Sequence, residues 1–510
     1  MILATNKTAY TVYIRPRSVK DAAKVAKVLS VIFSIDENVL YEKIISSKTS
    51  EFAAAKKVGR EYIEKLIEND LDGVYYTTDN ERVYPYGESL CQILGYTTSD
   101  GVGQSGVEKY YQNYLAGTDG EILYEADLVG KDIEGGTETY IPAVNGLTLR
   151  LSVDSEIQFI CDGIVSLAEQ KYTPKSVSLI VLEPKTGKIL ALSQSPSFDL
   201  NEPPRDDIEY LNKATRCSFI SDSYEPGSTF KIITSAANIE ETTLLNPKAI
   251  SLDHIYNGSR YRVVLGRKIK CWSNHEKGKH QNQTLKEALN NSCNPCFVDI
   301  ALSLGKEKMY EYIKAFNFGK TTGVDFYGEA AGMMLPESAV TDGDIARISF
   351  GQTIAVTGLQ LAAAACACVN GGIYNSPMIA EEICDETGKA VEILQNKRSE
   401  RVISESASKI LASYLEGVVS EGSGHKAYIE GYRVGGKTGT AQKYENGVIA
   451  QGKYVMSFMG FFPANDPEYL ALLAVDEPIG GLYGSTVAAP LVGELFKKII
   501  DCKKIRPVAG

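Results

Sequence analysis

Ser228 and Lys231 are the residues whose types and spacing point most directly to chemistry. They stand three positions apart in SYEPGSTFKIITSAANI, where apolar residues recur at helical spacing. Positions i and i+3 share one face of a helix, so the hydroxyl and the amine can meet. A serine is a weak nucleophile unless a base takes its proton, and a lysine can be that base when burial or a second cation depresses its pKa. The pair predicts a serine nucleophile with Lys231 as its general base.

Two further motifs supply groups that such a centre needs. Lys437, in GGKTGT, offers the second cation, and the small residues around it let a substrate lie along a strand. Ser292-Cys293-Asn294 adds a hydroxyl and an amide. Each motif alone occurs by chance in many sequences. In combination, the order S-x-x-K, S-x-N, K-T-G is that of penicillin-binding proteins and serine β-lactamases, which predicts an acyl-transfer centre.

Cysteine and histidine concentrate in the segment 271–297, which holds three of the ten cysteines and two of the four histidines. Thiolate and imidazole are the ligands that zinc prefers, in a tetrahedral set. The preferred ligands are Cys271, His280 and Cys293. The spacing therefore raises the hypothesis of a structural zinc site that includes the middle residue of the S-x-N motif.

The fourth zinc ligand is open between two residues. Cys296 fits by its spacing from Cys293, and Asp222 precedes Ser228 by six residues and could reach the same loop; His275 is a weaker choice. Two alternatives to zinc also stay open. The cysteines could be small core groups beside a solvated histidine loop, or Cys271 and Cys293 could form a disulfide that distorts the S-x-N motif.

Strand and helix patterns indicate the frame that must hold these motifs. GLTLRLSV alternates as a strand, the segment 176–194 reads as a strand pair, and the last strands are expected in GYRVGGKTGTAQ, KYVMSFMGFFPA and EYLALLAVDEP, before the helix AAPLVGELFKKIID. Strands that bracket a helical middle favour a sheet packed by helices on its faces. We expect an α/β fold of the α+β kind for this unit, residues 148–510.

Residues 1–147 are expected to form a separate, mixed α and β unit. SVKDAAKVAKVLSVIF has helical spacing, and the Gly/Tyr-rich segment 84–117 predicts an irregular, surface-rich stretch. A net charge of −11 and a pI near 5.2 argue against nucleic acid as a partner. No apolar run approaches the length of a membrane-spanning helix, and the first 20 residues contain no signal-peptide core.

From about residue 84 to its end, the chain resembles the class B penicillin-binding proteins, which are peptidoglycan D,D-transpeptidases. Besides the three motifs, the resemblance rests on YPYGESLCQILGY with GVGQSGVE, on LEPKTGKILALSQSPSFDLN and on FGQTIAVTGLQLAAAACACVNGG. ILATNKTAYTVYIRP resembles the chain just after the family's R-G-x-I-x-D-R-N-G box. CW followed by a histidine and QT, and then NSCNP, resembles the sporulation-specific members.

The resemblance implies a transpeptidase domain like that of the serine β-lactamases, on an elongated pedestal or dimerisation domain. It implies that Ser228 forms an acyl-enzyme with loss of terminal D-Ala, that Asn294 binds a substrate amide, and that Lys437, Thr438 and Thr440 hold the substrate carboxylate, with Gly439 between them. Backbone N–H groups of Ser228 and Thr440 would form the oxyanion hole. No cofactor is required for acyl transfer.

The expected partners are peptidoglycan stem peptides, β-lactam antibiotics and a membrane glycosyltransferase. We expect a soluble fragment of a protein anchored on the extracytoplasmic face of the cell membrane, with the forespore outer membrane as one location and spore cortex synthesis as its role. A division-type transpeptidase, a serine β-lactamase and a β-lactam sensor remain the alternatives. Rapid β-lactam hydrolysis would distinguish the lactamase.

Overall fold

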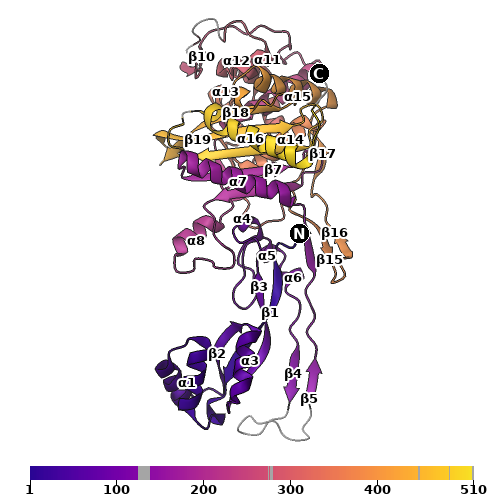
Figure 1. Ribbon diagram of the computed structural model, residues 1–510. Coiled ribbons are helices and arrows are strands. Elements are labelled where there is room, and N and C mark those ends of the chain that lie inside the picture. Colours follow the sequence, from indigo (N-terminus) through magenta and orange to yellow (C-terminus); the bar gives the residue numbers. More distant parts are fainter. Residues whose placement is uncertain (125–137, 274, 276–279, 446–447, 482, 508–510) are drawn as a thin grey trace.

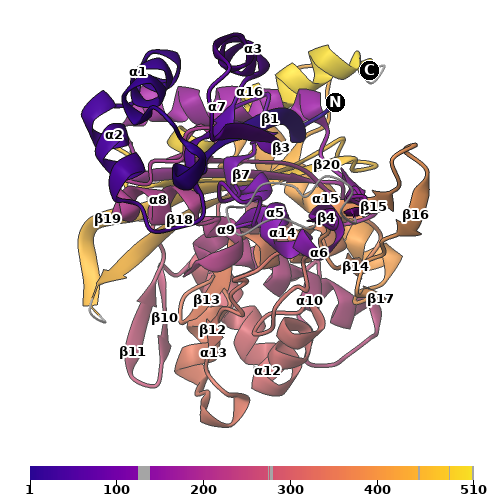
Figure 2. The same cartoon turned by 90° about the horizontal axis from the view of Figure 1, so that it is seen from below.

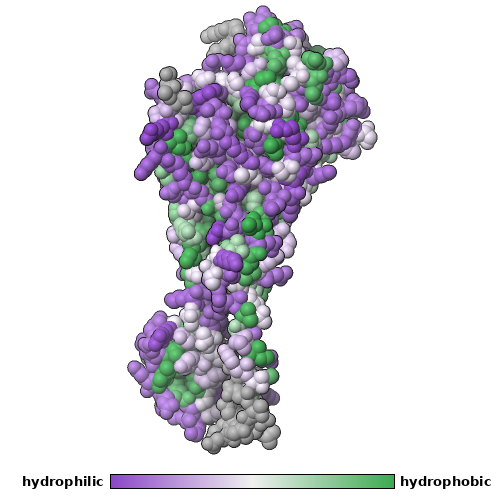
Figure 3. All heavy atoms as spheres, turned by 90° about the vertical axis from the view of Figure 1, so that its right-hand side faces the viewer, coloured by the Kyte–Doolittle hydropathy of each residue, from purple (hydrophilic) through white to green (hydrophobic). Residues whose placement is uncertain are grey.

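The molecule is elongated, with a narrow pedestal below a broad head (Figures 1 and 3). The computed structural model describes residues 1–510 except 125–137, 274, 276–279, 446–447, 482 and 508–510. Both termini of the chain lie away from the lower end of the pedestal, where the segments around α1 and β2 lie. The head therefore contains the C-terminal two thirds of the chain.

The lower pedestal is a three-stranded antiparallel sheet covered by helices. β1 (Thr5–Ile14) lies between β2 (Phe52–Val58) and β3 (Val74–Val83). Three helices bury an apolar stripe against it: α1 (Ala22–Phe33), α2 (Glu37–Ser46) and α3 (Arg60–Asn69). Asp21 and Asp36 cap α1 and α2 by accepting backbone N–H groups, as N-cap residues do. The helix expected from SVKDAAKVAKVLSVIF is confirmed.

The segment 84–117 forms the waist, and the expectation of a surface-rich stretch is wrong for its apolar residues. Its short helices are α4 (Cys91–Leu94), α5 (Gly106–Tyr110) and α6 (Gln112–Leu115). Leu90, Ile93 and Val107 are buried in the same hydrophobic core as the head. A Cβ on Gly95 would lie 2.0 Å from the Ser105 carbonyl oxygen, so its glycine permits a close crossing of two loops. Gly95, Gly103 and Gly106 therefore mark tight packing, whereas Gly101 is exposed as expected.

Pedestal and head meet at a small sheet and at a half-buried carboxylate. β6 (Thr148–Leu151) pairs antiparallel with β15 (Ala380–Cys384), which also pairs with β16 (Ala390–Ile393). Tyr111 of the waist donates its hydroxyl to Asp325 at 2.8 Å, and the same carboxylate accepts the backbone N–H groups of residues 379 and 380. β4 (Glu121–Tyr124) and β5 (Glu138–Ile141) form a separate ribbon along the pedestal.

The head is built on a five-stranded antiparallel sheet in the order β18-β19-β20-β7-β8. Its strands are β18 (Gly435–Glu445), β19 (Val448–Phe462), β20 (Tyr469–Asp476), β7 (Ser176–Leu182) and β8 (Ile189–Ser195). Successive residues of β7 enter different cores, with Leu179 in one and Ile180 in the other. Both faces are therefore buried, which confirms the predicted sheet packed by helices.

Helices cover the two faces unequally (Figure 2). α7 (Ser155–Tyr172) and α16 (Gly484–Lys503) pack on one face. The other face carries the larger core and these helices: α8 (Ile208–Thr215), α9 (Ser218–Ser221), α10 (Lys231–Thr243), α11 (Leu285–Asn290), α12 (Asn294–Ala315), α13 (Asp342–Ile348), α14 (Gly358–Val369) and α15 (Glu405–Ser420). Small ladders between them include β10 (Tyr261–Val264), β11 (Arg267–Lys270), β13 (Ile354–Thr357), β14 (Ile373–Asn375) and β17 (Ser399–Arg401). Among the described residues, no helix has the length and apolarity to cross a membrane.

Candidate active site and the adjacent cysteine–histidine cluster

Ser228 lies in a 3-10 turn, Gly227–Phe230, that leads directly into α10. A hydrogen bond from the Gly227 N–H to the Gly351 carbonyl, 3.0 Å long, holds this turn in place. Gly351 has φ +79°, and a Cβ there would lie 2.1 Å from the Gly227 oxygen. Only glycine fits this contact. Ser228 is thereby placed at the start of a buried helix, one turn before Lys231.

Lys231 is fully buried and lies at the centre of the site. Its Nζ is 2.7 Å from Asn294 Oδ1, 2.8 Å from the Ser292 carbonyl, and 3.1 Å from both the Ser228 and Ser292 hydroxyls. The two shortest contacts are to oxygens that only accept, so they take two N–H groups of the amine. A neutral amine then keeps its lone pair for the Ser228 hydroxyl proton, as a general base requires.

Ser292 connects the two lysines. Its hydroxyl is 3.1 Å from Lys231 Nζ and 2.9 Å from Lys437 Nζ. Ser292 has φ +55°, a left-handed conformation that is uncommon outside glycine, and it lies in the turn between α11 and α12. A capping box formed by Thr284 and Glu287 fixes the start of α11. The turn directs the Ser292 side chain between the lysines.

Burial sets the electrostatics of both lysines. Loss of hydration on burial lowers the pKa of Lys231 from 10.5 to about 8, although the neighbouring cysteine thiols act in the opposite direction. Burial, and then the positive charge of Lys231, hold the pKa of Lys437 well below its ordinary value. A neutral Lys231 is therefore available near neutral pH, and a buried serine–lysine–serine–lysine chain is available to move a proton.

This centre matches a known family along most of the chain. The family described as "Penicillin binding protein transpeptidase domain" matches residues 177–501, and "Penicillin-binding Protein dimerisation domain" matches residues 1–151. The chain belongs to the class B penicillin-binding proteins. The predicted fold and the predicted peptidoglycan transpeptidase activity are confirmed with it.

Relatives of this penicillin-binding protein carry sporulation and transpeptidase names. Stage V sporulation protein D of Bacillus subtilis (strain 168) is 38% identical over 99% of this chain and 77% of that protein. Peptidoglycan D,D-transpeptidase FtsI of Escherichia coli (strain K12) is 27% identical over 99% of this chain and 83% of that protein. The structure of Penicillin Binding Protein 2X from Streptococcus thermophilus superposes with a TM-score of 0.81 at 21% identity, covering 99% of this chain and 78% of that one, and supports the fold.

The substrate-binding residues predicted in this penicillin-binding protein lie along β18. Thr438, Gly439 and Thr440 follow Lys437 on this strand, whose outer edge pairs with no strand of the described residues. A Cβ on Gly439 would lie 2.3 Å from Ser457 Oγ, so β18 can run this close to β19 only with glycine there. An open sheet edge beside a nucleophile can pair with an extended peptide.

The structure brings together all five side chains predicted to be catalytic: Ser228, Lys231, Ser292, Asn294 and Lys437. Sequence reasoning missed Gly351 and Phe297. Phe297 presents its ring 5.1 Å from Lys231 Nζ, one turn after Asn294 on α12, and contributes to the burial of the amine. The sequence did indicate that Phe297 lies near the site, because residues three positions apart share one face of a helix and Phe297 follows Asn294 by three.

Acylation of Ser228 should become faster as pH rises through the pKa of Lys231. Only the neutral amine can take the Ser228 proton, and its fraction increases from pH 7 to pH 9 by about tenfold for a pKa about 8. The measurement is the rate constant for covalent labelling by a penicillin, followed by stopped-flow or gel fluorescence. A rate that is flat or falls over this range would contradict Lys231 as the base.

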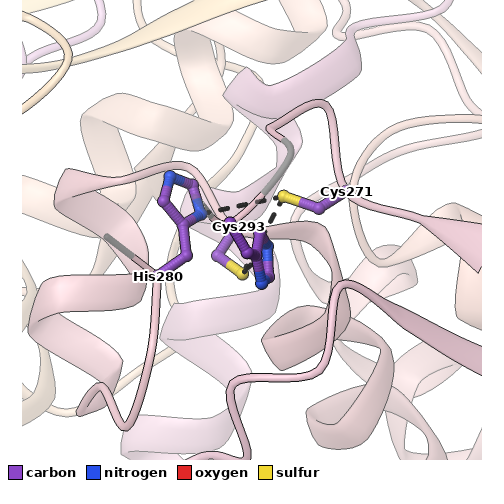
Figure 4. Close-up of side chains that lie close together, drawn as sticks. Cys271, His280 and Cys293 are labelled. Atoms are coloured by element: carbon purple, nitrogen blue, oxygen red, sulfur yellow. Dashed lines mark hydrogen bonds between the residues drawn. The ribbon is translucent and has the colours of Figure 1, made fainter. Parts of the chain in front are cut away.

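Four buried side chains of this penicillin-binding protein converge on the far side of the S-x-N turn (Figure 4). The possible ligand atoms of Cys271, His275, His280 and Cys293 all lie within 4.8 Å of one another. Cys271 Sγ is 3.8 Å from His280 Nδ1 and 4.0 Å from Cys293 Sγ, and Cys293 Sγ is 3.8 Å from His275 Nε2. Tetrahedral zinc with these ligands needs edges of about 3.3–3.8 Å, and the four donor atoms are spread slightly wider than that. The donor types suit zinc, and small movements of the side chains would close them on an ion.

The fourth member of this group corrects the sequence prediction. His275, rather than Asp222 or Cys296, joins the other three residues. Asp222 forms an ion pair with Arg216, and Cys296 lies one turn into α12. His275 also places its Nδ1 2.9 Å from the Gly258 carbonyl, which leaves Nε2 directed at Cys293. A backbone carbonyl that accepts the N–H of one ring nitrogen commonly orients a histidine whose other ring nitrogen binds a metal.

Proposed function

We propose that this penicillin-binding protein is the peptidoglycan D,D-transpeptidase of spore cortex synthesis. The observation that carries the chemistry is the buried contact of Lys231 with Ser228, Ser292 and Asn294. The sporulation role rests on the 38% identity with a protein named stage V sporulation protein D. A division-type transpeptidase and a sporulation transpeptidase would use the same catalytic centre. The two candidate functions differ only in the cellular process in which the cross-links are made.

In the first half-reaction, the donor peptide pairs with the open edge of β18 and presents its penultimate D-Ala carbonyl to Ser228. Ser228 Oγ forms a bond to that carbon while its proton passes to Lys231 Nζ. Ser292 carries a proton to the leaving nitrogen, the C–N bond breaks, and terminal D-Ala departs. Backbone N–H groups of Ser228 and Thr440 stabilise the oxyanion, an effect worth roughly 3 kcal/mol for each donor.

In the second half-reaction, the amine of a neighbouring stem peptide attacks the ester carbon. The new C–N bond forms, the bond to Ser228 Oγ breaks, and the amine proton returns to Oγ through Lys231. Lys437, Thr438 and Thr440 hold the donor's terminal carboxylate until D-Ala departs, and Asn294 holds a substrate amide. A β-lactam acylates Ser228 in the same way, but after its ring C–N bond breaks the nitrogen remains tethered to the acyl group. It therefore does not vacate the place that the acceptor amine needs, and the acyl group stays on Ser228.

A structural zinc ion held by Cys271, His275, His280 and Cys293 is part of the proposal. Two thiols and two imidazoles that are all buried form a donor set typical of closed, structural zinc sites. A zinc ion there would fix the loop that supplies Ser292 and Asn294. Asn294 directly follows the ligand Cys293, and its Nδ2 donates to the carbonyl of Lys270, the residue before Cys271, at 3.3 Å.

The proposed location is the extracytoplasmic face of the cell membrane through an N-terminal anchor, including the forespore outer membrane. A membrane glycosyltransferase that makes the glycan strands is the proposed partner. Deleting the gene and scoring spore cortex against vegetative growth separates the two roles. Loss of cortex with normal growth is expected, whereas filamentous or arrested vegetative cells would favour the division-type role.

Turnover distinguishes the transpeptidase from a β-lactamase and from a β-lactam sensor. With a penicillin, we expect stoichiometric acylation of Ser228 and deacylation that is slower than about one event per several minutes. With a D-Ala thioester donor and an amine acceptor, we expect repeated product formation. Rapid penicillin hydrolysis would contradict the proposal in favour of the lactamase, and acylation without any thioester turnover would favour the sensor.

A further inference from the structure

Two exposed aromatic side chains meet beside the catalytic residues. Trp272 is 56% exposed and Tyr483 is 48% exposed, yet their ring centroids are 6.1 Å apart at an interplanar angle of 58°. They come from distant parts of the chain, one directly after Cys271 and the other at the N-cap of α16. Large aromatic rings left in water as a pair offer a surface for a ligand that combines apolar and charged parts.

The two residues lie beside different catalytic motifs, Trp272 through its ring and Tyr483 through its neighbour Gly484. Trp272 Nε1 donates to the Asn291 carbonyl at 3.2 Å, immediately before Ser292. On the other side, the N–H of Gly484 donates to Thr440 Oγ1 at 3.1 Å. A Cβ on Gly484 would lie 2.1 Å from the Gly439 carbonyl, so the residue after Tyr483 touches β18 itself. The aromatic pair therefore connects the S-x-N turn to the K-T-G-T strand.

The chemistry of the two half-reactions says which substrate passes here. The leaving amine and the attacking amine occupy the same position at the acyl carbon, because the second half-reaction reverses the bond changes of the first. The terminal residue of the donor, with its carboxylate at Thr438 and Thr440, vacates that position. The acceptor must then enter beside Thr440, where Tyr483 lies.

The acceptor arrives as a primary amine on an aliphatic carbon, and such an amine is an ammonium ion at neutral pH. Indole and phenol rings attract an ammonium group over their faces and pack on the attached methylene or methyl carbons. We propose that Trp272 and Tyr483 form the acyl-acceptor subsite of the enzyme, which takes the alkylammonium group of the second stem peptide.

The chemical step follows from this placement and rests on the proposed transpeptidase function. The bound ammonium loses one proton to solvent. The neutral nitrogen then attacks the ester carbon, the C–N bond forms, the bond to Ser228 Oγ breaks, and the second amine proton returns to Oγ. The aromatic pair holds the acceptor before attack and takes no part in acylation of Ser228.

The test is the partition of the acyl-enzyme between water and amines in the full chain. A D-Ala thioester acylates Ser228, and the ratio of aminolysis to hydrolysis is measured against the concentration of D-alanine at pH 7. Tyr483→Leu should raise the D-alanine concentration at equal partition by about two- to thirtyfold, whereas Tyr483→Phe should leave it unchanged. Trp272→Leu should raise the D-alanine concentration at equal partition as Tyr483→Leu does. Trp272→Phe keeps an aromatic ring, so it should raise that concentration less.

Two controls make the outcome specific to the acceptor. Hydroxylamine, an amine nucleophile that is uncharged at pH 7, should partition alike in both Tyr483 variants, and penicillin should acylate both at the wild-type rate. The Trp272 variants also lose the Nε1 hydrogen bond to the Asn291 carbonyl beside Ser292, so they are judged by their D-alanine partition relative to their own hydroxylamine partition. An unchanged D-alanine partition in Tyr483→Leu would overturn the inference, and so would an equal loss for hydroxylamine or slower penicillin acylation, which would place the pair on the donor side. Failure of the wild-type protein to react with penicillin would instead contradict the proposed function.

Discussion

Replacing Lys231 by methionine should slow acylation of Ser228 by penicillin about 10²- to 10⁴-fold, the usual contribution of a general base. Methionine retains the length and apolar stem of lysine, so it fills the buried space on Phe297 without supplying a proton acceptor. The charge at position 231 disappears together with the amine, so the substitution introduces no new unpaired charge there. The second-order rate constant for labelling by a fluorescent penicillin measures the effect.

Two matched variants define the range of this experiment. Ser228→Ala removes the nucleophile and sets the background of non-covalent labelling. Lys314→Met changes a partly exposed lysine that pairs with Glu337 on the surface, and should keep the wild-type rate. Acylation by Lys231→Met within threefold of wild type would show that another group activates Ser228, and Lys437 would then be the base to examine through the Ser292 hydroxyl.

Replacing Cys293 by serine should remove the proposed zinc ion, lower the Tm of the head and slow acylation. Structural zinc stabilises the folded state outright, and a loss of roughly 3 kcal/mol corresponds to a fall of about 4 °C in the Tm of a domain as large as the head. Because Cys293 separates Ser292 from Asn294, the catalytic turn should lose its fixed geometry, with acylation slower by about 10- to 100-fold. Metal analysis, calorimetry and penicillin labelling provide the three readouts.

The choice of control decides between the possible fourth ligands. His275→Ala should lose zinc, whereas Cys296→Ser and Asp222→Asn should keep it, because these two residues lie outside the group of four. Counting thiols in the denatured wild-type protein addresses the disulfide: ten free cysteines are expected. Two fewer thiols would favour a Cys271–Cys293 disulfide, and ten thiols with less than one zinc per several chains would mean that the cysteines are small core residues.

The catalytic centre was readable in the sequence because its chemistry is local. Ser228 and Lys231 share a helical face, and the order of the three motifs identifies the partners that folding brings from distant segments. The sheet could be predicted for a similar reason. The sequences of its last three strands either alternate apolar and polar residues or are apolar throughout, and turn residues separate them. The domain boundary between residues 147 and 148 stays a prediction. β6, which begins at Thr148, pairs with β15 of the head.

The sequence spacing did not single out His275 as a ligand. His275, His280 and Asn282 all have positive φ, between 47° and 63°, a conformation that residue type indicates weakly outside glycine. The rings of His275 and His280 lie with their centroids 4.8 Å apart, a contact that five residues of separation do not predict. The waist was misjudged for a related reason: its glycines signal loops, but the packing of Leu90 and Ile93 depends on the distant head.

The joint between pedestal and head has a mechanical consequence. β6, where the chain enters the head, pairs with β15 in an antiparallel ladder with one irregularity, and Asp325 holds the waist hydroxyl of Tyr111 and the β15 backbone with one carboxylate. A force applied at the foot of the pedestal would shear this joint, so that its hydrogen bonds carry the force together. Such a joint is stiffer than one whose hydrogen bonds break one after another. The pedestal can thus act as a lever arm that transmits torque to the catalytic head instead of a tether that absorbs it.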